Sequence, residues 1–385
     1  MRQSLKIPLS GWADRHIATL ATATGCNAIA QLNGAALLGE RAALNGFTIP
    51  GVVSAGGGSR LYKTCSGWVS LSLARPSDRE MLPALFRDAS MDTKDDDLVA
   101  ARMAASHAEH LVDQGNTLGL SIARVGETLH SPAWEVTVEG LHRDCIQHRP
   151  PLVVDLSALW AGPLATHLIQ LAGAKVLKIE SSARPDAMRD GDAPFYNLLN
   201  QNKASIAVDF GKELGRKALL ALIRKADIVV ESSRPRALLQ LGINADELVR
   251  DIPGLVWMSI TAHGVRGDTA NRVGFGDDCG VAGGLTAALV QASGGVGFVG
   301  DAIADPLAGI TAAGLAWQRW QSGKGGRVVL SMSGVVANAL SEEDKVIDDL
   351  RIWSTAQGVP FPDVIARAAS PARAFGADTE EWLTC

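Results

Sequence analysis

Residues 153–180, VVDLSALWAGPLATHLIQLAGAKVLKIE, contain the pattern that decides the fold. They begin with a continuous apolar run at 153–157, which predicts a strand buried on both faces. Gly162 and Pro163 then open an apolar helical run that continues through Leu171, and 175–180 predict a second strand. A strand, a helix and a second strand of these lengths predict a βαβ unit with parallel strands.

The same alternation continues along the second half of the chain. Further strands are predicted at 205–210, 227–232, 255–264 and 327–332. Helices are predicted at 212–224, before Gly242, and from Pro306 to about Gln321. The predicted fold class is therefore α/β, with a doubly wound, Rossmann-like parallel sheet covered by helices on both faces. Such sheets bind ligands at the carboxyl ends of their strands.

The first 150 residues have a different pattern. Residues 12–45 are rich in Ala and Leu and predict helices, as do 98–114. Between them, two apolar runs around a Ser66–Gly67 turn predict a β-hairpin. We therefore expect three parts: 1–148 with a second, smaller α+β domain, 149–340 with the parallel sheet, and a tail at 341–385 that packs on the large domain.

Composition argues against nucleic acid and membrane as partners. The formal net charge is −5, and Lys and Arg are scattered among acids, so no basic patch for nucleic acid is predicted. Residues 279–300 are uncharged, but their seven glycines predict buried irregular backbone with short elements rather than a membrane span. The first residues do not have a signal-peptide pattern. The five cysteines form no C-x-x-C pair, which predicts reduced thiols and a cytoplasmic location.

Several motifs of known chemistry are missing from the sequence. It contains neither a P-loop nor a G-x-G-x-x-G turn after a strand, so nucleoside triphosphates and NAD are not predicted ligands. It also lacks the G-x-S-x-G elbow of α/β-hydrolases. His107 and His110 lack zinc-ligand spacing and predict a solvated helix face, and no metal site is predicted.

The segment VGFVGDAIADPLAGITAAG at 296–314 is the remaining candidate for chemistry. Asp305 ends an apolar stretch directly before a predicted helix, where the helix dipole favours a carboxylate. One interpretation is an ordinary N-cap aspartate. The other is a nucleophilic carboxylate held ionised beside a glycine-rich loop. Composition alone leaves both open.

Several motifs, in order, resemble class III CoA-transferases, the family that includes formyl-CoA and carnitine CoA-transferases and α-methylacyl-CoA racemases. Besides 153–180, the resemblance rests on NLLNQNKASIAVDF (197–210), ADIVVESSRPRALLQLGI (226–243), LVWMSITAHGVRGD (255–268), the segment around Asp305, SGKGGRVVLSM (322–332) and GADTEEWL (376–383). The resemblance implies acyl-CoA and a carboxylic acid acceptor as substrates, without a metal.

The resemblance also implies a covalent mechanism. The aspartate of the ADPLAG segment, Asp305, attacks the acyl-CoA thioester and forms an anhydride, which CoA converts into an aspartyl-CoA thioester. Asp301 is the rival nucleophile, because the spacing counted back from Ser322 and Gly323 favours it, whereas the local motif favours Asp305.

By the same resemblance, CoA lies across the ends of the parallel strands. The residues implied to bind it are Leu159, Trp160, Ala161, Asn202, Lys203, Ser232, Ser233 and Arg234. Many members carry an arginine for the CoA phosphates where this chain has Ser181 and Ser182. Arg184 is the predicted substitute, with Arg189 and Arg236 as alternatives. Core packing or solvated charge remains an alternative role for Trp160, Lys203 and Arg234.

The N-terminal half adds a glycine-rich loop. GGGSRLYKTCSGWVSLSLA resembles the family's small domain, which normally follows the large one, so the segment order looks permuted here. Gly56, Gly57 and Gly58 are then expected in a loop that folds over the nucleophile. The resemblance implies an interlocked homodimer. Two alternative functions are an α-methylacyl-CoA racemase, disfavoured because Phe275 stands where a histidine is expected, and a non-catalytic CoA-binding partner subunit.

Overall fold

The computed structural model of the chain describes residues 5–127, 131–144, 149–234 and 236–383. Its main sheet has seven strands: β4 Trp134–His142, β5 Leu152–Asp155, β6 Lys175–Ser181, β7 Ala204–Val208, β8 Ile228–Glu231, β9 Val256–Thr261 and β10 Lys324–Ser331. Their order is β4-β10-β9-β8-β5-β6-β7, in which β4 alone runs antiparallel to its neighbour. The six parallel strands follow the order of dinucleotide-binding doubly wound sheets, whose direction reverses beside the first strand, here between β5 and β8. The predicted α/β class is confirmed.

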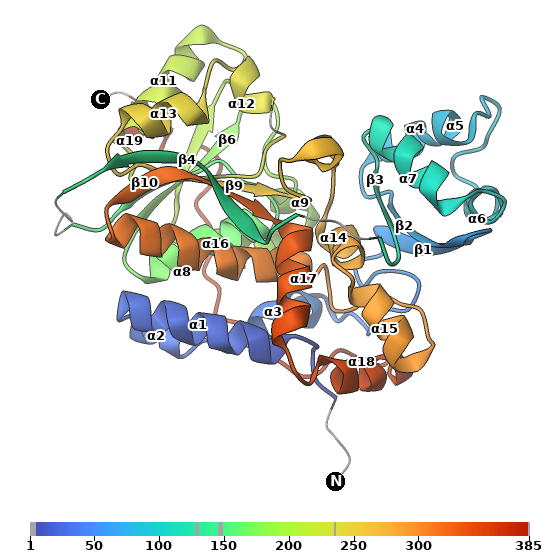
Figure 1. The fold of residues 1–385 in the computed structure, drawn as a ribbon. Coiled ribbons are helices and arrows are strands. Elements are labelled where there is room, and N and C mark those ends of the chain that lie inside the picture. The colour runs from blue at the N-terminus through green and yellow to red at the C-terminus, as the bar shows by residue number, and fades with distance from the viewer. Residues whose placement is uncertain (1–4, 128–130, 145–148, 235, 384–385) are drawn as a thin grey trace.

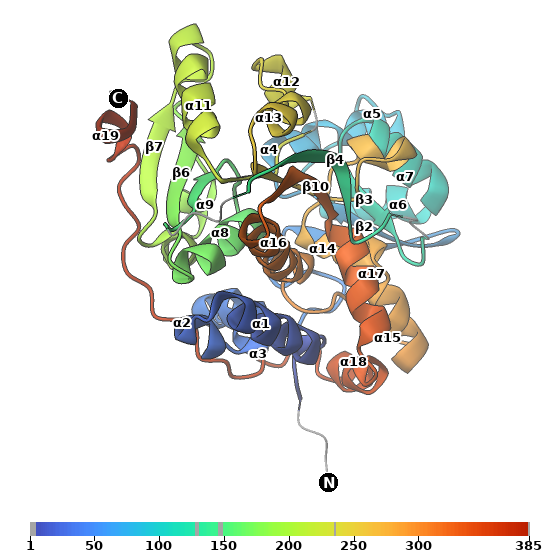
Figure 2. The ribbon, with the colours of Figure 1, turned by 60° about the vertical axis from the view of Figure 1, so that its left-hand side comes forward.

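Helices cover both faces of this sheet (Figures 1 and 2). One face packs on α11 Glu213–Lys225, α12 Ala237–Gln240 and α13 Ala245–Asp251. The other packs on α8 Ala161–Leu171, α10 Ala193–Asn200 and α16 Ala304–Gln321. Beyond α8 and α16 lies a further layer, α1 Ser10–Thr24, α2 Asn27–Ala30 and α3 Gly34–Asn45, which shares the same hydrophobic core.

A smaller unit lies beside the sheet domain (Figure 1). It contains the antiparallel strands β1 Ser59–Thr64, β2 Gly67–Ser72 and β3 Ser121–Arg124, with α4 Pro76–Glu80, α5 Leu82–Phe86, α6 Asp96–Ala104 and α7 Ala108–Thr117. β1 and β2 confirm the hairpin expected around Ser66–Gly67, and this α+β unit has its own apolar core.

The remaining described elements connect these parts. They are α9 Met188–Gly191, the 3₁₀ turn η1 Gly267–Asn271, α14 Gly276–Ala282, α15 Leu285–Ser293, α17 Met332–Glu342, α18 Val346–Thr355 and α19 Thr379–Leu383. No helix in the described ranges combines the length and the apolar character needed to cross a bilayer.

The glycine-rich stretch 279–300 contains more regular structure than expected. Most of it folds as α14 and α15, which meet at Gly283–Gly284. A Cβ at Gly283 would lie 2.6 Å from the Val336 Cβ and 2.7 Å from the Ser333 carbonyl oxygen on α17. Glycine at 283 allows α14 and α17 to pack closely. Helices therefore form in this glycine-rich stretch, although glycine has a low helix propensity.

The division of the chain at 148/149 and 340/341 stays a prediction. Residues 145–148, beside the first boundary, lie outside the described residues. β4 precedes that boundary and pairs with β10, so the main sheet includes a strand from the N-terminal part.

Replacing Gly283 by alanine should therefore destabilise the protein. We expect Gly283→Ala to lower the free energy of unfolding by about 1–3 kcal/mol, because the added methyl group overpacks the contact with α17. Gly314→Ala is the control, since no atom lies within 4 Å of the added Cβ in the middle of α16. Alanine there should raise the free energy of unfolding by about 0.5–1 kcal/mol. Denaturant unfolding measures the change in the free energy of unfolding for both variants. Equal changes in Gly283→Ala and Gly314→Ala would contradict overpacking at Gly283.

Candidate functional site

Asp305 lies in the first turn of α16. The helix begins at Ala304 with Ile303 as its N-cap, which excludes the interpretation of Asp305 as an ordinary N-cap. The predicted helix start at Pro306 is two residues too late. The preceding turn already has helical hydrogen bonding, because the Asp305 N–H donates to the Ala302 carbonyl at 2.9 Å. The carboxylate nevertheless lies at the positive end of an 18-residue helix.

Two other helix starts contact the Asp305 carboxylate. A Cβ at Gly276, the first residue of α14, would lie only 2.2 Å from Asp305 Oδ2, so the carboxylate lies directly against this glycine. The backbone N–H of Ala161, the first residue of α8, hydrogen-bonds to the carboxylate and lowers its pKa. The amino ends of three helices thus converge on one side chain, and each favours negative charge there.

Asp301 has a different environment. It is fully buried, and its two oxygens accept hydrogen bonds from Arg41 Nε and Nη2 at 2.8 and 2.5 Å. The Arg41 guanidinium also lies 5.1 Å from the ring centroid of Trp160 and 5.8 Å from that of Phe47. Burial disfavours the charge on Arg41, but Asp301, together with smaller contributions from Asp277 and Asp305, outweighs burial and the pKa of Arg41 is raised. This geometry describes a fixed ion pair.

Burial raises the pKa of Asp301 to about 6 even though Arg41 opposes the shift. Asp305 has no comparable partner, and its pKa is raised further, to about 7. Burial is the main cause; the charge of Arg41 opposes it and that of Asp277 adds to it. Burial also raises the pKa of Asp277, whose Oδ1 accepts the Ala302 N–H at 3.1 Å. Asp305 is partly exposed, unlike Asp301, and a carboxylate of raised basicity is the better nucleophile.

The structure brings the predicted glycine loop to this ion pair. A Cβ at Gly56 would lie 3.0 Å from Arg41 Nη2, and Gly57 has a φ of 76°. Gly58 is half-buried and accepts a hydrogen bond from the Leu73 N–H at 2.9 Å. The loop therefore borders the guanidinium that pairs with Asp301.

The predicted residues that follow β5 form the loop entering α8. Leu159 has a φ of 67°, and its N–H donates to the buried Asp186 at 3.1 Å. Trp160 is 2% exposed, and its ring packs edge-on against that of Phe195 with 4.8 Å between the ring centroids, so the indole is in the core. The backbone N–H of its neighbour Ala161 contacts Asp305 directly.

The predicted residues after β6 and β8 lie at the same edge of the sheet. The Ala158 N–H approaches the Ser232 hydroxyl at 3.4 Å, which joins the loops after β5 and β8 at the point where strand order reverses. Ser233 hydrogen-bonds to Glu231, while Arg184 and Arg234 have exposed side chains. These positions surround the crevice in which doubly wound sheets bind ligands.

Asn202 and Lys203 are not brought to that crevice. Both precede β7, so their backbone lies toward the amino ends of the parallel strands, while the Lys203 side chain reaches Asp155, the last residue of β5, inside the core. Lys203 is 1% exposed, and its Nζ donates to four oxygens, those of Asp155, Pro163, Thr166 and Asn200. These contacts hold the ammonium inside the protein, where burial outweighs Asp155 and lowers the pKa of Lys203 to about 8. Asn202 is exposed with a φ of 62°.

The sequence matches the profile of CoA-transferase family III over residues 151–383. The chain belongs to this family. A succinyl-CoA:glutarate CoA-transferase from Mus musculus is 28% identical over 241 residues, which cover 57% of this chain and 54% of that protein. A formyl-CoA:oxalate CoA-transferase from Rhodopseudomonas palustris is 28% identical over 242 residues, covering 57% and 55%. The chain spans about half the length of the curated relatives it matches.

Solved structures also resemble part of the chain. A hypothetical protein from Mycobacterium tuberculosis is 25% identical, with a TM-score of 0.46 and coverage of 52% of this chain and 58% of that one. A CAIB/BAIF family protein from Brucella suis is 24% identical, with a TM-score of 0.42 and coverage of 50% and 55%. The profile match includes Asp301 and Asp305, whereas Arg41 and the glycine loop lie before it.

Arg41, Gly276 and Asp277 belong to the site but were not among the residues predicted from the sequence. The adjacent acids of GDD at 276–278 were a signal, because consecutive acids after a glycine within a largely apolar region are unusual. Arg41 had no such signal, since it lies 260 positions from Asp301.

Adding a methyl group at Gly276 tests the placement of Asp305. We expect Gly276→Ala to lower the rate of the CoA transfer that the family resemblance implies by at least about 100-fold, because the Cβ would displace the Asp305 carboxylate and the Ala302 carbonyl. Gly280→Ala on the same helix is the control, since its nearest atoms lie 3.7 and 3.8 Å from the added Cβ. Rates are compared at matched folded fractions, and equal rates in the two variants would contradict this geometry.

Proposed function

We propose that the protein is an acyl-CoA:carboxylate CoA-transferase with Asp305 as its covalent nucleophile. One observation carries the proposal: within the family region, a partly exposed carboxylate with a pKa of about 7 lies against the amino ends of α8, α14 and α16. Asp301 is the weaker candidate, because both of its oxygens are held by Arg41 and water does not reach it.

The proposed reaction has four balanced steps. The Asp305 carboxylate attacks the thioester carbonyl of the donor, forming a mixed anhydride and releasing CoA as a thiolate. The thiolate attacks the aspartyl carbonyl, giving an aspartyl-CoA thioester and the donor's free carboxylate. The acceptor carboxylate attacks this thioester, forming a second anhydride and again releasing the CoA thiolate. The thiolate then attacks the acceptor's acyl carbon, which yields the new acyl-CoA and regenerates Asp305.

The surroundings of Asp305 support these steps. The Ala161 N–H is fixed by the loop 156–160 and can stabilise negative charge on the oxygen of Asp305 when its carbonyl is attacked. Burial leaves Asp305 more basic than an exposed aspartate, so its ionised form is a stronger nucleophile. The loop of Gly56, Gly57 and Gly58 lies close enough to Arg41 to cover this region, and in our proposal it closes over the acyl group.

The substrates are proposed from the chemistry that the relatives' names describe. Succinyl-CoA:glutarate and formyl-CoA:oxalate exchange both pass CoA between carboxylic acids. We propose short acyl-CoA donors and a carboxylic acid acceptor, with CoA lying across the crevice between the loops after β5, β6 and β8 and its phosphates near Arg184 and Arg234. Leu159, Ser232 and Ser233 border this path.

Several further expectations belong to the proposal. The interlocked homodimer, the cytoplasmic location and the permuted segment order are retained from the resemblance and the sequence. Ile365, which is 91% exposed in the extended chain between α18 and α19, is consistent with a contact to a second subunit. Among the described residues, Cys26, Cys65 and Cys279 have no disulfide partner.

Trapping the covalent intermediate tests the nucleophile. The purified protein is incubated with a panel that includes succinyl-CoA and formyl-CoA, quenched with hydroxylamine, and mapped by peptide mass spectrometry. We expect a hydroxamate at Asp305 and a fall in transfer rate of at least about 10³-fold in Asp305→Asn. Asp301→Asn is the matched comparison, which should still form the adduct at Asp305.

Other outcomes have distinct meanings. A hydroxamate at Asp301 would retain the function and replace the nucleophile. An absence of any adduct together with α-proton exchange in heavy water would favour a racemase. If neither were found with any thioester while CoA still bound, a non-catalytic partner subunit would be the better explanation.

Arg41 should set the pH dependence of the reaction. Its positive charge lowers the pKa of Asp305, so Arg41→Met should raise that pKa and move the acidic limb of the rate profile to higher pH. Arg41→Lys retains the charge and should shift the profile less. Arg41→Met should also lower the free energy of unfolding by about 3–5 kcal/mol, because Asp301 is left buried without its partner. A rate profile that does not move in Arg41→Met would contradict this role.

A further inference from the structure

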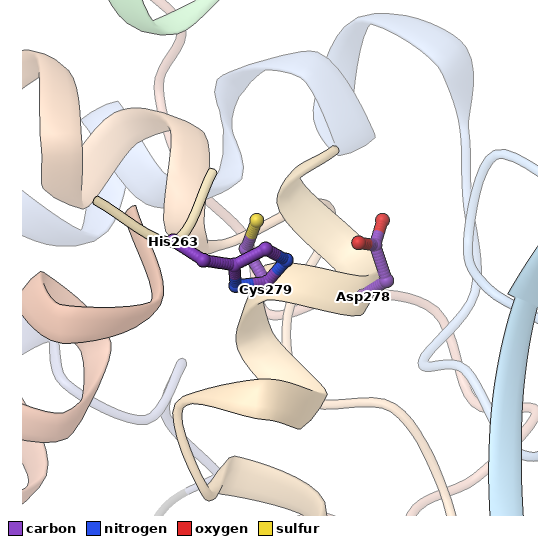
Figure 3. Close-up of side chains that lie close together, drawn as sticks. All are labelled: His263, Asp278 and Cys279. Atoms are coloured by element: carbon purple, nitrogen blue, oxygen red, sulfur yellow. The ribbon is translucent and has the colours of Figure 1, made fainter. Parts of the chain in front are cut away.

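Three side chains with metal-binding atoms meet behind the first turn of α14 (Figure 3). His263 follows β9, and Asp278 and Cys279 are the third and fourth residues of α14. Their ligand atoms lie within 4.8 Å of one another, and all three residues are at most 1% exposed. Among the residues that the structure describes, this is the one such group with possible metal ligands.

Two of the three residues have a buried polar atom without a hydrogen-bond partner. These atoms are His263 Nε2 and Asp278 Oδ2. The Ser121 hydroxyl lies near Asp278 and lowers the pKa of this carboxyl, but it does not meet the geometry of a hydrogen bond to Oδ2. A buried polar atom without a partner is costly, so a native fold normally supplies one. The Cys279 thiol has only a weak contact, 3.6 Å from Sγ to the Ala262 carbonyl oxygen.

The opposite atoms of the same groups are already held. His263 Nδ1 lies 3.0 Å from the Ser333 hydroxyl, and when Nδ1 donates this bond the Nε2 lone pair is left free. Asp278 Oδ1 accepts the Phe275 N–H at 2.8 Å. In metal sites, hydrogen bonds to the ligand atoms that do not bind the metal orient the side chains toward it.

We propose that His263 Nε2, Asp278 Oδ2 and Cys279 Sγ are three ligands of a structural zinc site whose fourth ligand is a buried water. A nitrogen, an oxygen and a sulfur ligand suit Zn²⁺, which binds imidazole, carboxylate and thiolate. Bound as carboxylate and thiolate, Asp278 and Cys279 balance the two charges of the ion inside the protein, and the Cys279 proton is released to solvent on binding.

Gly274 is part of the same arrangement. A Cβ there would lie 2.7 Å from Cys279 Sγ and 2.9 Å from Asp278 Oδ2, so the glycine allows the backbone to pass directly over two of the ligands. The site would tie the end of β9 to α14, whose first residue, Gly276, contacts Asp305. None of the ligands is accessible to a substrate, so the role is structural.

Metal analysis tests the site independently of transferase activity. The full chain is produced with added zinc, purified without chelators, and analysed by inductively coupled plasma mass spectrometry. We expect about one zinc ion per chain. Replacement by Co²⁺ should give a thiolate-to-cobalt charge-transfer band that Cys279→Ser lacks. Cys65→Ser, which changes an exposed cysteine in the hairpin turn, is the control and should retain both zinc and band.

A second measurement needs no variant. Titrating zinc into chelator-stripped wild-type protein should raise its melting temperature, because the ion binds the folded state. The proposal is overturned if wild-type protein contains no zinc and its melting temperature is unchanged by zinc. Equal zinc content in Cys279→Ser and wild type would overturn it as well.

Discussion

The ion pair between Arg41 and Asp301 is the contact on which the rest of the site depends. It joins α3, which lies outside the matched family region, to the turn that leads into α16. Trp160 and Phe47 flank the guanidinium, so the same residue also packs the start of α8 against the N-terminal helices. Removing one partner of a buried pair leaves an uncompensated charge. The N-terminal helices are therefore part of the site rather than an addition to it.

A second set of buried charges fixes the loop that carries Ala161. Lys178 Nζ donates to the Ser157 carbonyl at 2.5 Å and to Asp186 at 3.0 Å, and Asp186 in turn accepts the Leu159 N–H. Asp155, at the end of β5, accepts from Lys203. Such pairs cost desolvation and add little net stability, but they allow one arrangement of the loop and exclude others. The direction of the Ala161 N–H follows from this constraint.

The limits of the sequence analysis follow from these two sets of contacts. Apolar periodicity is local, so the parallel strands and the hairpin at 59–72 could be predicted, and the ADPLAG motif located Asp305. Arg41 could not be found, because pairing across 260 positions has no local pattern. Lys203 lies in a family-like motif, but tertiary packing turns its side chain into the core. The exact first residue of a helix is equally hard to predict, since α16 begins at Ala304 and not at the predicted Pro306.

The charges around Asp305 also bear on the order of events in a transfer reaction. Asp277, Asp301 and Asp305 share the field of one guanidinium, so with every acid ionised the site has excess negative charge. A substrate carboxylate would be repelled there. Burial reduces this repulsion by raising the pKa of all three acids, that of Asp301 to about 6 and that of Asp305 to about 7, so that a proton on Asp305 neutralises part of the charge near neutral pH. Acylation of Asp305 removes its negative charge altogether, and in the proposed mechanism the acceptor carboxylate attacks only after that step. The site is thus least repulsive to an anion at the stage when an anion must react.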